Sequence, residues 1–228
     1  MAMTYFANPY MSYAQIVPHN TNTTVYNAPN GVPVVDIAKT NGAGVSHNQF
    51  NNYNVDSRGV VLNNGNSSQL MRASQLAGQV PANLKLTDEA NLIVNEVVLS
   101  NRSVLAGFTE VLGHAADVVV ANPYGITCNG CGFINTPNVS LTTGVPQFNG
   151  GGALTGFQVD TGDILITGNG LNGTEANGGT PDYLALISRS MQIEGQINAA
   201  NLDVVAGAND WDHVNRTATA RAPTGTAP

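Results

Sequence analysis

The chain has 228 residues, which is long enough for one all-β domain with a sizeable core. Only 10% of the residues are charged, and 8 Lys and Arg stand against 15 Asp and Glu. The net charge of −7 provides no basic stripe for nucleic-acid phosphates or anionic lipids, so these numbers argue against a nucleic-acid-binding protein.

The polar residues are mostly uncharged, and 25 Gly accompany many Asn, Thr and Ser residues. Lys and Glu, which support exposed helices, are scarce, whereas Asn and Gly adopt the left-handed conformations of tight turns. The composition therefore predicts short strands joined by turns. No apolar run approaches the roughly 18 residues that a membrane-spanning helix needs.

The two ends of the chain differ from its middle. Met1–Ala14 lacks the basic start and apolar centre of a signal peptide, so the protein is either cytosolic or a mature fragment with an added initiating Met, and the Asn-rich, Lys-poor composition favours the fragment. Residues 1–35 hold Phe6, Tyr10, Tyr13 and Tyr26 and are expected to form a partly flexible N-terminal extension and cap. Residues 36–211 form the expected main domain, and residues 212–228 begin a Thr/Ala/Pro linker.

Short Val/Ile/Leu-rich runs alternate with Asn-Gly, Gly-Gly and Asn-Pro pairs from Val32 onward. One stretch, Ser68–Leu76, has the spacing of a short helix that Gly78 and Pro81 would end.

Strand-like segments recur in the second half at a nearly constant spacing. Val119, Leu141, Ile164 and Ile187 follow one another at intervals of about 22 to 23 residues, and Val204 comes next. An all-strand repeat of this length predicts a right-handed parallel β-helix with coils of about 20–23 residues and short extra-helical antiparallel strands. Both ends of such a solenoid need covers if the chain is to remain a monomer, and Asp210–His213 is the expected C-terminal cap.

The two cysteines form one CxxC motif, Cys128 and Cys131. The four His residues lack ligand spacing, so we expect no metal site, and Asn129-Gly130 imposes a turn where a thioredoxin-like motif needs a helix. A tight disulfide and two reduced thiols remain as alternatives. Export to an oxidising compartment favours the disulfide.

Other chemical patterns have simpler explanations. The GxGxxG pattern at Gly168–Gly173 has no helix behind it and is read as a turn, so we expect no cofactor. The acidic pairs Asp160/Asp163 and Asp210/Asp212 suggest a glycan-cleaving site, but turn formation and solvation explain them as well. We therefore expect a protein that is not an enzyme.

The segment Asn122-Pro123-Tyr124-Gly125-Ile126 follows an apolar strand directly. Asn binds its own backbone, Pro restricts φ, and Gly permits positive φ, so the segment predicts a rigid turn at a coil corner.

At this point the chain resembles the two-partner secretion (TPS) domain of filamentous haemagglutinins, haemolysins and contact-dependent growth inhibition toxins. The family's NPNGI signature appears with Tyr124 in place of its second Asn, and Thr127–Gly144 also resembles family sequence. A second family element, NEV followed by NPSxLxG, appears with Arg102 in place of Pro, and its matching residues are Asn95, Glu96, Val97, Asn101, Ser103, Leu105 and Gly107.

The resemblance implies a secretion signal. A family member crosses the inner membrane by the general secretory machinery, engages the periplasmic POTRA domains of a TpsB-type outer-membrane β-barrel transporter, and folds into a β-helix at the cell surface of a Gram-negative bacterium. The resemblance thus makes the turns at 101–107 and 122–126 the recognition sites. We expect changes at Asn122 or Gly125 to abolish export without unfolding the fragment.

Two alternatives remain open at this stage. An adhesin module would bind cell surfaces itself, and a β-helical polysaccharide-cleaving enzyme would turn over an acidic glycan. Binding to the transporter's periplasmic domains would separate the secretion signal from the enzyme.

Overall fold

The computed structural model describes residues 15–171 and 181–222, and strands make up all the regular structure in those ranges. The all-β prediction is confirmed, and none of these residues forms a helix able to cross a membrane. The strands are β1 (Ile16–Pro18), β2 (Thr24–Asn27), β3 (Pro33–Asp36), β4 (Val45–Tyr53), β5 (Val60–Asn64), β6 (Met71–Ser74), β7 (Gly78–Pro81), β8 (Leu92–Val97), β9 (Ser103–Leu105), β10 (Phe108–Gly113), β11 (Asp117–Ala121), β12 (Ile126–Cys128), β13 (Gly132–Ile134), β14 (Asn138–Thr142), β15 (Val145–Phe148), β16 (Leu154–Val159), β17 (Asp163–Ile166), β18 (Tyr183–Ser188), β19 (Ser190–Ile193), β20 (Leu202–Ala206), β21 (Asn209–Asp212) and β22 (Thr217–Ala220).

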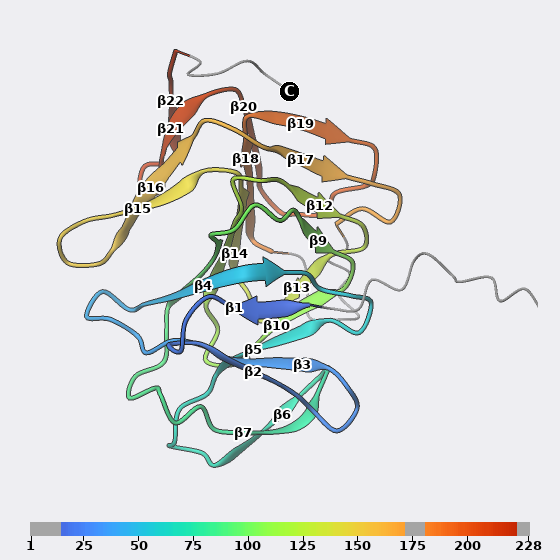
Figure 1. Ribbon diagram of the computed structural model, residues 1–228, viewed down its shortest axis with the longest axis vertical. Coiled ribbons are helices and arrows are strands. Elements are labelled where there is room, and N and C mark those ends of the chain that lie inside the picture. The colour runs from blue at the N-terminus through green and yellow to red at the C-terminus, as the bar shows by residue number, and fades with distance from the viewer. Residues whose placement is uncertain (1–14, 172–180, 223–228) are drawn as a thin grey trace, which may run out of the picture.

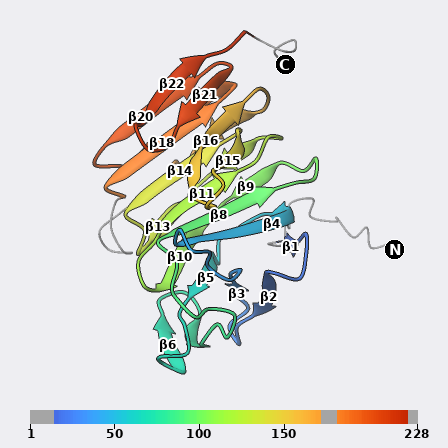
Figure 2. The same cartoon turned by 90° about the vertical axis from the view of Figure 1, so that its left-hand side faces the viewer.

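Three sheets form the walls of a β-helix (Figures 1 and 2). Sheet A has the order β1-β4-β8-β11-β14-β18-β20, sheet B has β13-β10-β5-β3-β2, and sheet C has β19-β17-β12-β9. The chain passes from A to C to B in each of two consecutive coils, β8-β9-β10 and β11-β12-β13. Neighbouring coils pair in parallel, whereas the edge strands β1 and β2 pair antiparallel with β4 and β3.

The strand spacing predicted from the sequence mixes two of these sheets. Val119 is in register with Ser140, which in turn is in register with Ala185, all in sheet A. Ile164 instead pairs with Ile126 in sheet C. The strands β15 and β16 are inserted between β14 and β17 and delay the return of the chain to sheet A. The expectation that Ile164 marks an equivalent position is therefore wrong.

Sheet A is buried on both faces where a second, antiparallel sheet packs against its outer face. Val118 and Val120 of β11 point into the main core, whereas Val119 packs in a second core with Phe157 and Trp211. This second core lies beneath a four-stranded antiparallel sheet, β15-β16-β21-β22, on the flank of the coils (Figure 1). Burial on both faces explains why β11 and β18 read as unbroken apolar runs.

The segment Asp210–His213 does not close the end of the β-helix. Asp210, Trp211 and Asp212 belong to β21, which pairs with β16 on the flank. At the last coil, Leu202 and Val204 of β20 are 44% and 49% exposed. The predicted terminal cap at this segment is therefore wrong, because Trp211 finds its apolar contacts on the outer face of sheet A.

The stretch expected to be a short helix forms the antiparallel hairpin β6–β7. The hydroxyl of Ser74 accepts hydrogen bonds from the backbone N–H groups of Leu76 and Ala77, and Gly78 has a φ of +73°. Side chain-to-backbone bonds of this kind compete with a helix. The buried carboxylate of Glu110 also accepts bonds from the Ser74 hydroxyl (2.6 Å) and from the backbone N–H groups of Gln75 (2.9 Å) and Leu76 (3.0 Å).

The N-terminal strands lie along the edges of the β-helix. β1 covers the edge of β4, and β2 covers the edge of β3. Tyr26 of β2 is half-buried against an apolar cluster that includes Val34 and Val61. Phe6, Tyr10 and Tyr13 lie outside the described residues.

Replacement of Glu110 by Ala tests the anchoring of the hairpin. The variant leaves two backbone N–H groups without their charged acceptor, so we expect the free energy of unfolding to fall by about 2–3 kcal/mol. Urea denaturation measures the change. Asp88→Asn, at an exposed position, serves as the control and should change the free energy by less than about 0.5 kcal/mol. Equal effects of the two variants would contradict the anchoring role.

Candidate functional site

The two predicted motifs lie side by side at one corner of the β-helix, where the chain passes from sheet A to sheet C. The first turn joins β8 to β9, and the second joins β11 to β12. Figure 1 shows β9, β12 and β17 stacked one above another. Because β9 and β12 pair in register, with Ser103 opposite Ile126, the two turns occupy equivalent positions in consecutive coils.

The side chain of Asn122 joins these two turns. Its Nδ2 donates to the backbone O of Asn101 and to Oγ of Ser103, each at 2.9 Å. Its Oδ1 accepts the backbone N–H of Tyr124 at 2.9 Å. The side chain is completely buried, so each of these bonds satisfies a polar group that water cannot reach. Asn122 therefore determines both the shape of its own turn and its attachment to the preceding coil.

The turn itself is tight, because the N–H of Gly125 donates to the backbone O of Asn122 at 3.0 Å. Gly125 has a φ of +105°, and a Cβ at this position would collide with the guanidinium of Arg102. Ile126, the next residue, is buried in the main core. Tyr124 is the exception in this motif, since 48% of it is exposed.

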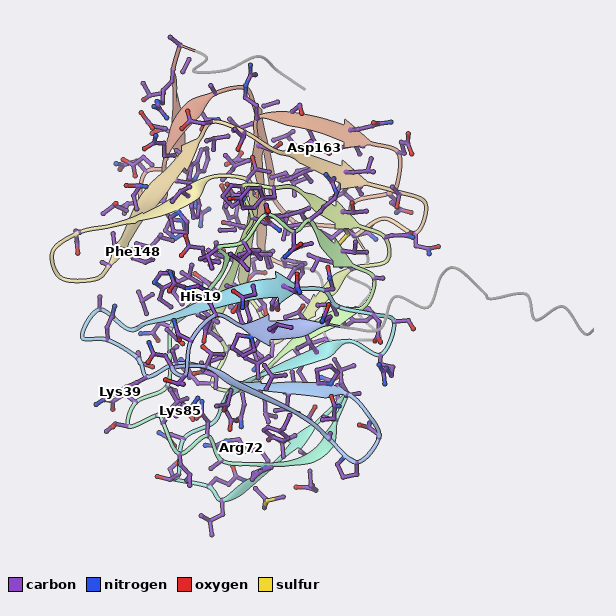
Figure 3. All side chains as sticks on the ribbon, in the orientation of Figure 1. His19, Lys39, Arg72, Lys85, Phe148 and Asp163 are labelled. Atoms are coloured by element: carbon purple, nitrogen blue, oxygen red, sulfur yellow. A yellow bond between two sulfur atoms is a disulfide. The ribbon has the colours of Figure 1, made fainter. Side chains whose placement is uncertain are left out.

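Arg102 occupies the position where the family pattern has Pro, and its guanidinium holds the turn from the other side. It forms a bidentate ion pair with Asp163, in which both N–O distances are 2.8 Å. It also donates to Oγ1 of Thr127 at 2.8 Å and to the backbone O of Ile126 at 3.0 Å. The hydrogen bonds from Arg102 hold the pKa of Asp163, labelled in Figure 3, below its ordinary value.

The residues of the NEV element point alternately into and out of the core. Asn95 is buried, with its Nδ2 3.5 Å from the hydroxyl of Tyr53, and Val97 belongs to the main core. Glu96 faces outward and accepts bonds from His47 (2.8 Å) and Gln49 (3.2 Å). Burial opposes its ionisation, but these hydrogen bonds outweigh that effect and lower the pKa of Glu96.

The rest of the second motif is also largely structural. Ser103 and Leu105 are buried, and a Cβ on Gly107 would collide with the backbone O of Asp56. Asn101 is exposed and donates from Nδ2 to the backbone O of Asn51 at 3.1 Å. Among the residues that match the two family patterns, Asn101 and Tyr124 are exposed, and Val104, at a variable position of the second pattern, is exposed as well. The expectation that Asn122 and Gly125 can be changed without affecting the fold is revised, because both are buried and conformationally restricted.

A disulfide bond joins Cys128 and Cys131 at the other end of β12, between β12 and β13, with their Cα atoms 5.4 Å apart. Gly170, in the turn that begins the GxGxxG pattern, has a φ of +64°, whereas Asn172 and Gly173 of that pattern lie outside the described residues. Among the described residues, no three His, Cys, Asp or Glu side chains gather closely enough to hold a metal ion.

The acidic pairs considered from the sequence are engaged in ion pairs and turns. Asp163 binds Arg102, and Asp160 accepts a bond from Arg221 at 2.9 Å. Asp210 lies 3.5 Å from the same Arg221 side chain, and Asp212 accepts the backbone N–H of Asn215. The pairing of Arg102 with Asp163 is not evident from the sequence, because 61 positions and an inserted hairpin separate the two residues.

Comparison with known proteins shows a consistent set of similarities. A family model described as the TPS secretion domain matches residues 14–228. The chain is 50% identical over 198 residues to 16S rRNA endonuclease CdiA of Enterobacter cloacae, an alignment that covers 86% of this chain and 6% of that protein. It is 39% identical over 217 residues to filamentous hemagglutinin of Bordetella pertussis, which covers 92% of this chain and again 6% of the relative.

The fold is also similar to a solved structure. The crystal structure of the filamentous hemagglutinin secretion domain superimposes with a TM-score of 0.85 at 38% sequence identity. The match covers 93% of this chain and 70% of the other. The chain spans only a small part of its full-length relatives, so names such as nuclease belong to those whole proteins.

Replacement of Asn122 by Ala should destabilise the chain by about 2–4 kcal/mol. The variant removes the partner of the Asn101 carbonyl, the Ser103 hydroxyl and the Tyr124 N–H, and it leaves these groups unsatisfied. Chemical denaturation measures the loss. Asn129→Ala, which removes one bond at an exposed position, is the matched control and should cost less than about 1 kcal/mol. A loss at Asn122 no larger than that at Asn129 would refute its joining role.

Replacement of Asp163 by Asn should show a pH-dependent cost. Because the folded-state pKa of Asp163 is lowered, its contribution is complete above the unfolded-state pKa of about 3.9 and is lost as the pH falls through the folded-state value. The carboxylate is partly exposed, so we expect a difference of only about 0.5–1 kcal/mol at pH 7. Denaturation curves at pH 7 and below pH 3 measure it. A difference that persists unchanged in acid would contradict the ion-pair explanation.

Proposed function

Since the chain belongs to the TPS secretion domain family, we propose that it is the N-terminal secretion signal of a large exoprotein. In this proposal the domain targets the exoprotein to its outer-membrane β-barrel transporter and then nucleates β-helix folding at the cell surface. The general secretory machinery delivers the chain to the periplasm, and the POTRA domains of a TpsB-type transporter are its direct partner. The final location is the cell surface or the medium of a Gram-negative bacterium.

The observation that carries the proposal is the exposure of Tyr124 on an otherwise buried turn. Asn122 restrains the turn from inside, and Arg102 restrains it from the equivalent turn of the preceding coil. Tyr side chains supply large contact areas at interfaces and frequently dominate binding energy. A rigid turn that presents one aromatic ring is suited to recognition, and its position in the family's signature motif favours the transporter as the partner.

The contacts between coils support the nucleation step. Asn122 bonds to the preceding coil, and its backbone N–H donates to Thr142 of the following coil at 2.9 Å. Each added coil buries its apolar residues against the one before, so growth of the β-helix is energetically downhill. We propose that the chain enters the transporter in an extended form and that folding outside prevents its return.

Several finer features belong to the same proposal. The β-helix is right-handed with coils of about 20–23 residues, apart from the insertions, and the chain is a monomer. Residues before 36 are the N-terminal extension and cap, whereas the boundary expected at residue 211 is revised, because Asp212 belongs to β21 and β22 pairs with β21 in the flanking sheet. The domain itself catalyses no reaction, and a toxin, haemolysin or adhesin activity resides in the remainder of the exoprotein.

Replacement of Tyr124 by Ala separates recognition from folding. We expect export of the full exoprotein to fall by about tenfold, which corresponds to about 1.4 kcal/mol of lost binding. The free energy of unfolding of the purified chain should change by less than about 0.5 kcal/mol, because the ring is exposed. Export is measured by the ratio of extracellular to cell-associated protein, and binding by pull-down with the transporter's periplasmic domains.

Val214→Ala is the control for this experiment, since Val214 is 74% exposed and lies outside both motifs. It should leave export and binding unchanged. Normal export and normal pull-down of Tyr124→Ala would remove the turn from the recognition site. Binding of the isolated chain to whole cells, with no binding to the transporter, would instead support an adhesin module.

A further inference from the structure

The sulfur atoms of the disulfide are enclosed by the coils on both sides. Cys128 is 0% exposed and Cys131 is 1% exposed. Cys128 lies in β12 between Leu105 of β9 and Ile166 of β17, with which it pairs in register. A small oxidant or reductant therefore has no path to the sulfurs while the neighbouring coils are in place.

The backbone around the disulfide is attached to the same two coils. The N–H of Asn129 donates to the backbone O of Leu105 at 2.9 Å, which ties the loop to the preceding coil. The N–H of Thr167 donates to Cys128 O at 2.9 Å, and that of Gly130 donates to Gly170 O at 2.8 Å, which ties it to the following coil. Access to either sulfur thus requires the displacement of at least one coil.

We infer that Cys128 and Cys131 are joined before the coils fold, by a disulfide-bearing protein oxidant that acts on the extended chain in the periplasm. This inference rests on the proposed function, because only an exported chain meets such an oxidant. The order of the two events follows from the burial of the sulfurs. Because oxidation needs access to the thiols, it precedes the folding that encloses them.

The reaction is a thiol–disulfide exchange with a disulfide-bearing protein oxidant. The thiolate of one Cys attacks a sulfur of the oxidant's disulfide and forms a mixed disulfide. The thiolate of the second Cys then attacks the sulfur of the first, forms the Cys128–Cys131 bond and releases the oxidant as a dithiol. The two protons lost from the cysteines are recovered on the two thiols of the oxidant, which takes up the two electrons.

The small size of the loop makes early closure compatible with transit. Only Asn129 and Gly130 lie between the bonded residues, whose Cα atoms are 5.4 Å apart. A fully extended chain spans about 10–11 Å over the same three residues, so the bond shortens the chain slightly and adds no wide loop. A bonded chain of this kind can pass through a barrel in an extended form.

Thiol labelling in cells that lack the partner barrel tests the order of events. The full exoprotein is trapped with acid, and a mass-tagged maleimide is added with or without prior reduction. We expect Cys128 and Cys131 in the periplasmic chain to be tagged only after reduction. Free thiols in the periplasmic chain, together with a bonded pair at the surface of cells that have the barrel, would overturn the inference.

The control is Cys128→Ala/Cys131→Ala: the tags that appear in the parent and disappear in this variant report on Cys128 and Cys131, whatever other cysteines the exoprotein has. Its export beside the partner barrel should equal that of the parent within about twofold, because a bond of this size does not obstruct transit. Export of the variant several-fold above the parent would overturn this conclusion. Appearance of the exoprotein at the surface without the barrel would refute the proposed function. The maleimide labelling of Cys128 and Cys131 does not depend on that result, so the inferred order of events is tested separately.

Accessibility is measured separately on the purified chain. Reduction of the disulfide by dithiothreitol in buffer should be slower by about two orders of magnitude than in concentrated urea, because the folded state must open locally first. Equal rates in the two solutions would show that the folded coils do not shield the sulfurs, and would remove the basis for the inferred order.

Discussion

The buried amide of Asn122 is the contact on which the rest of the corner depends. It bonds to the backbone of one turn and to the backbone and a side chain of the turn one coil before it. A short polar side chain with donors and an acceptor is needed here, because unsatisfied buried groups are costly. In the turn that Asn122 restrains, Gly125 has positive φ and Tyr124 faces solvent. The proposed recognition by Tyr124 and the stacking of the two coils therefore involve the same residue, Asn122.

The two departures from the family pattern have physical explanations. Arg102 lacks the rigidity of Pro, but its guanidinium binds Asp163, Thr127 and the Ile126 carbonyl, so ion-pair and hydrogen-bond contacts restrain the turn instead. Tyr124 replaces Asn at a position whose backbone N–H is already satisfied by Asn122. Its side chain is therefore available for contacts with a partner.

The flanking sheet accounts for the low charge of the middle of the chain. Strands of sheet A bury one face in the main core and the other beneath β16 and β21, so few positions remain for charged residues. Where ionic groups do occur, they connect segments that are distant in sequence, as Arg221 does with Asp160. The corner and the flanking sheet join one coil to the next, whereas the disulfide lies within a single coil, between β12 and β13.

The amino-acid sequence by itself determined the strand-and-turn composition, the turn at 122–126 and the resemblance to the family, because each depends on neighbouring residues. Tertiary structure decided what depends on residues far apart. Ser68–Leu76 became a hairpin because Glu110 binds its tip, Ile164 moved to sheet C because a hairpin was inserted before it, and Trp211 covered the flank because sheet A offered an apolar face there. The hydrogen bond from Asn122 to Asn101 also depends on tertiary structure, because the length of the coil determines which residues meet at a corner.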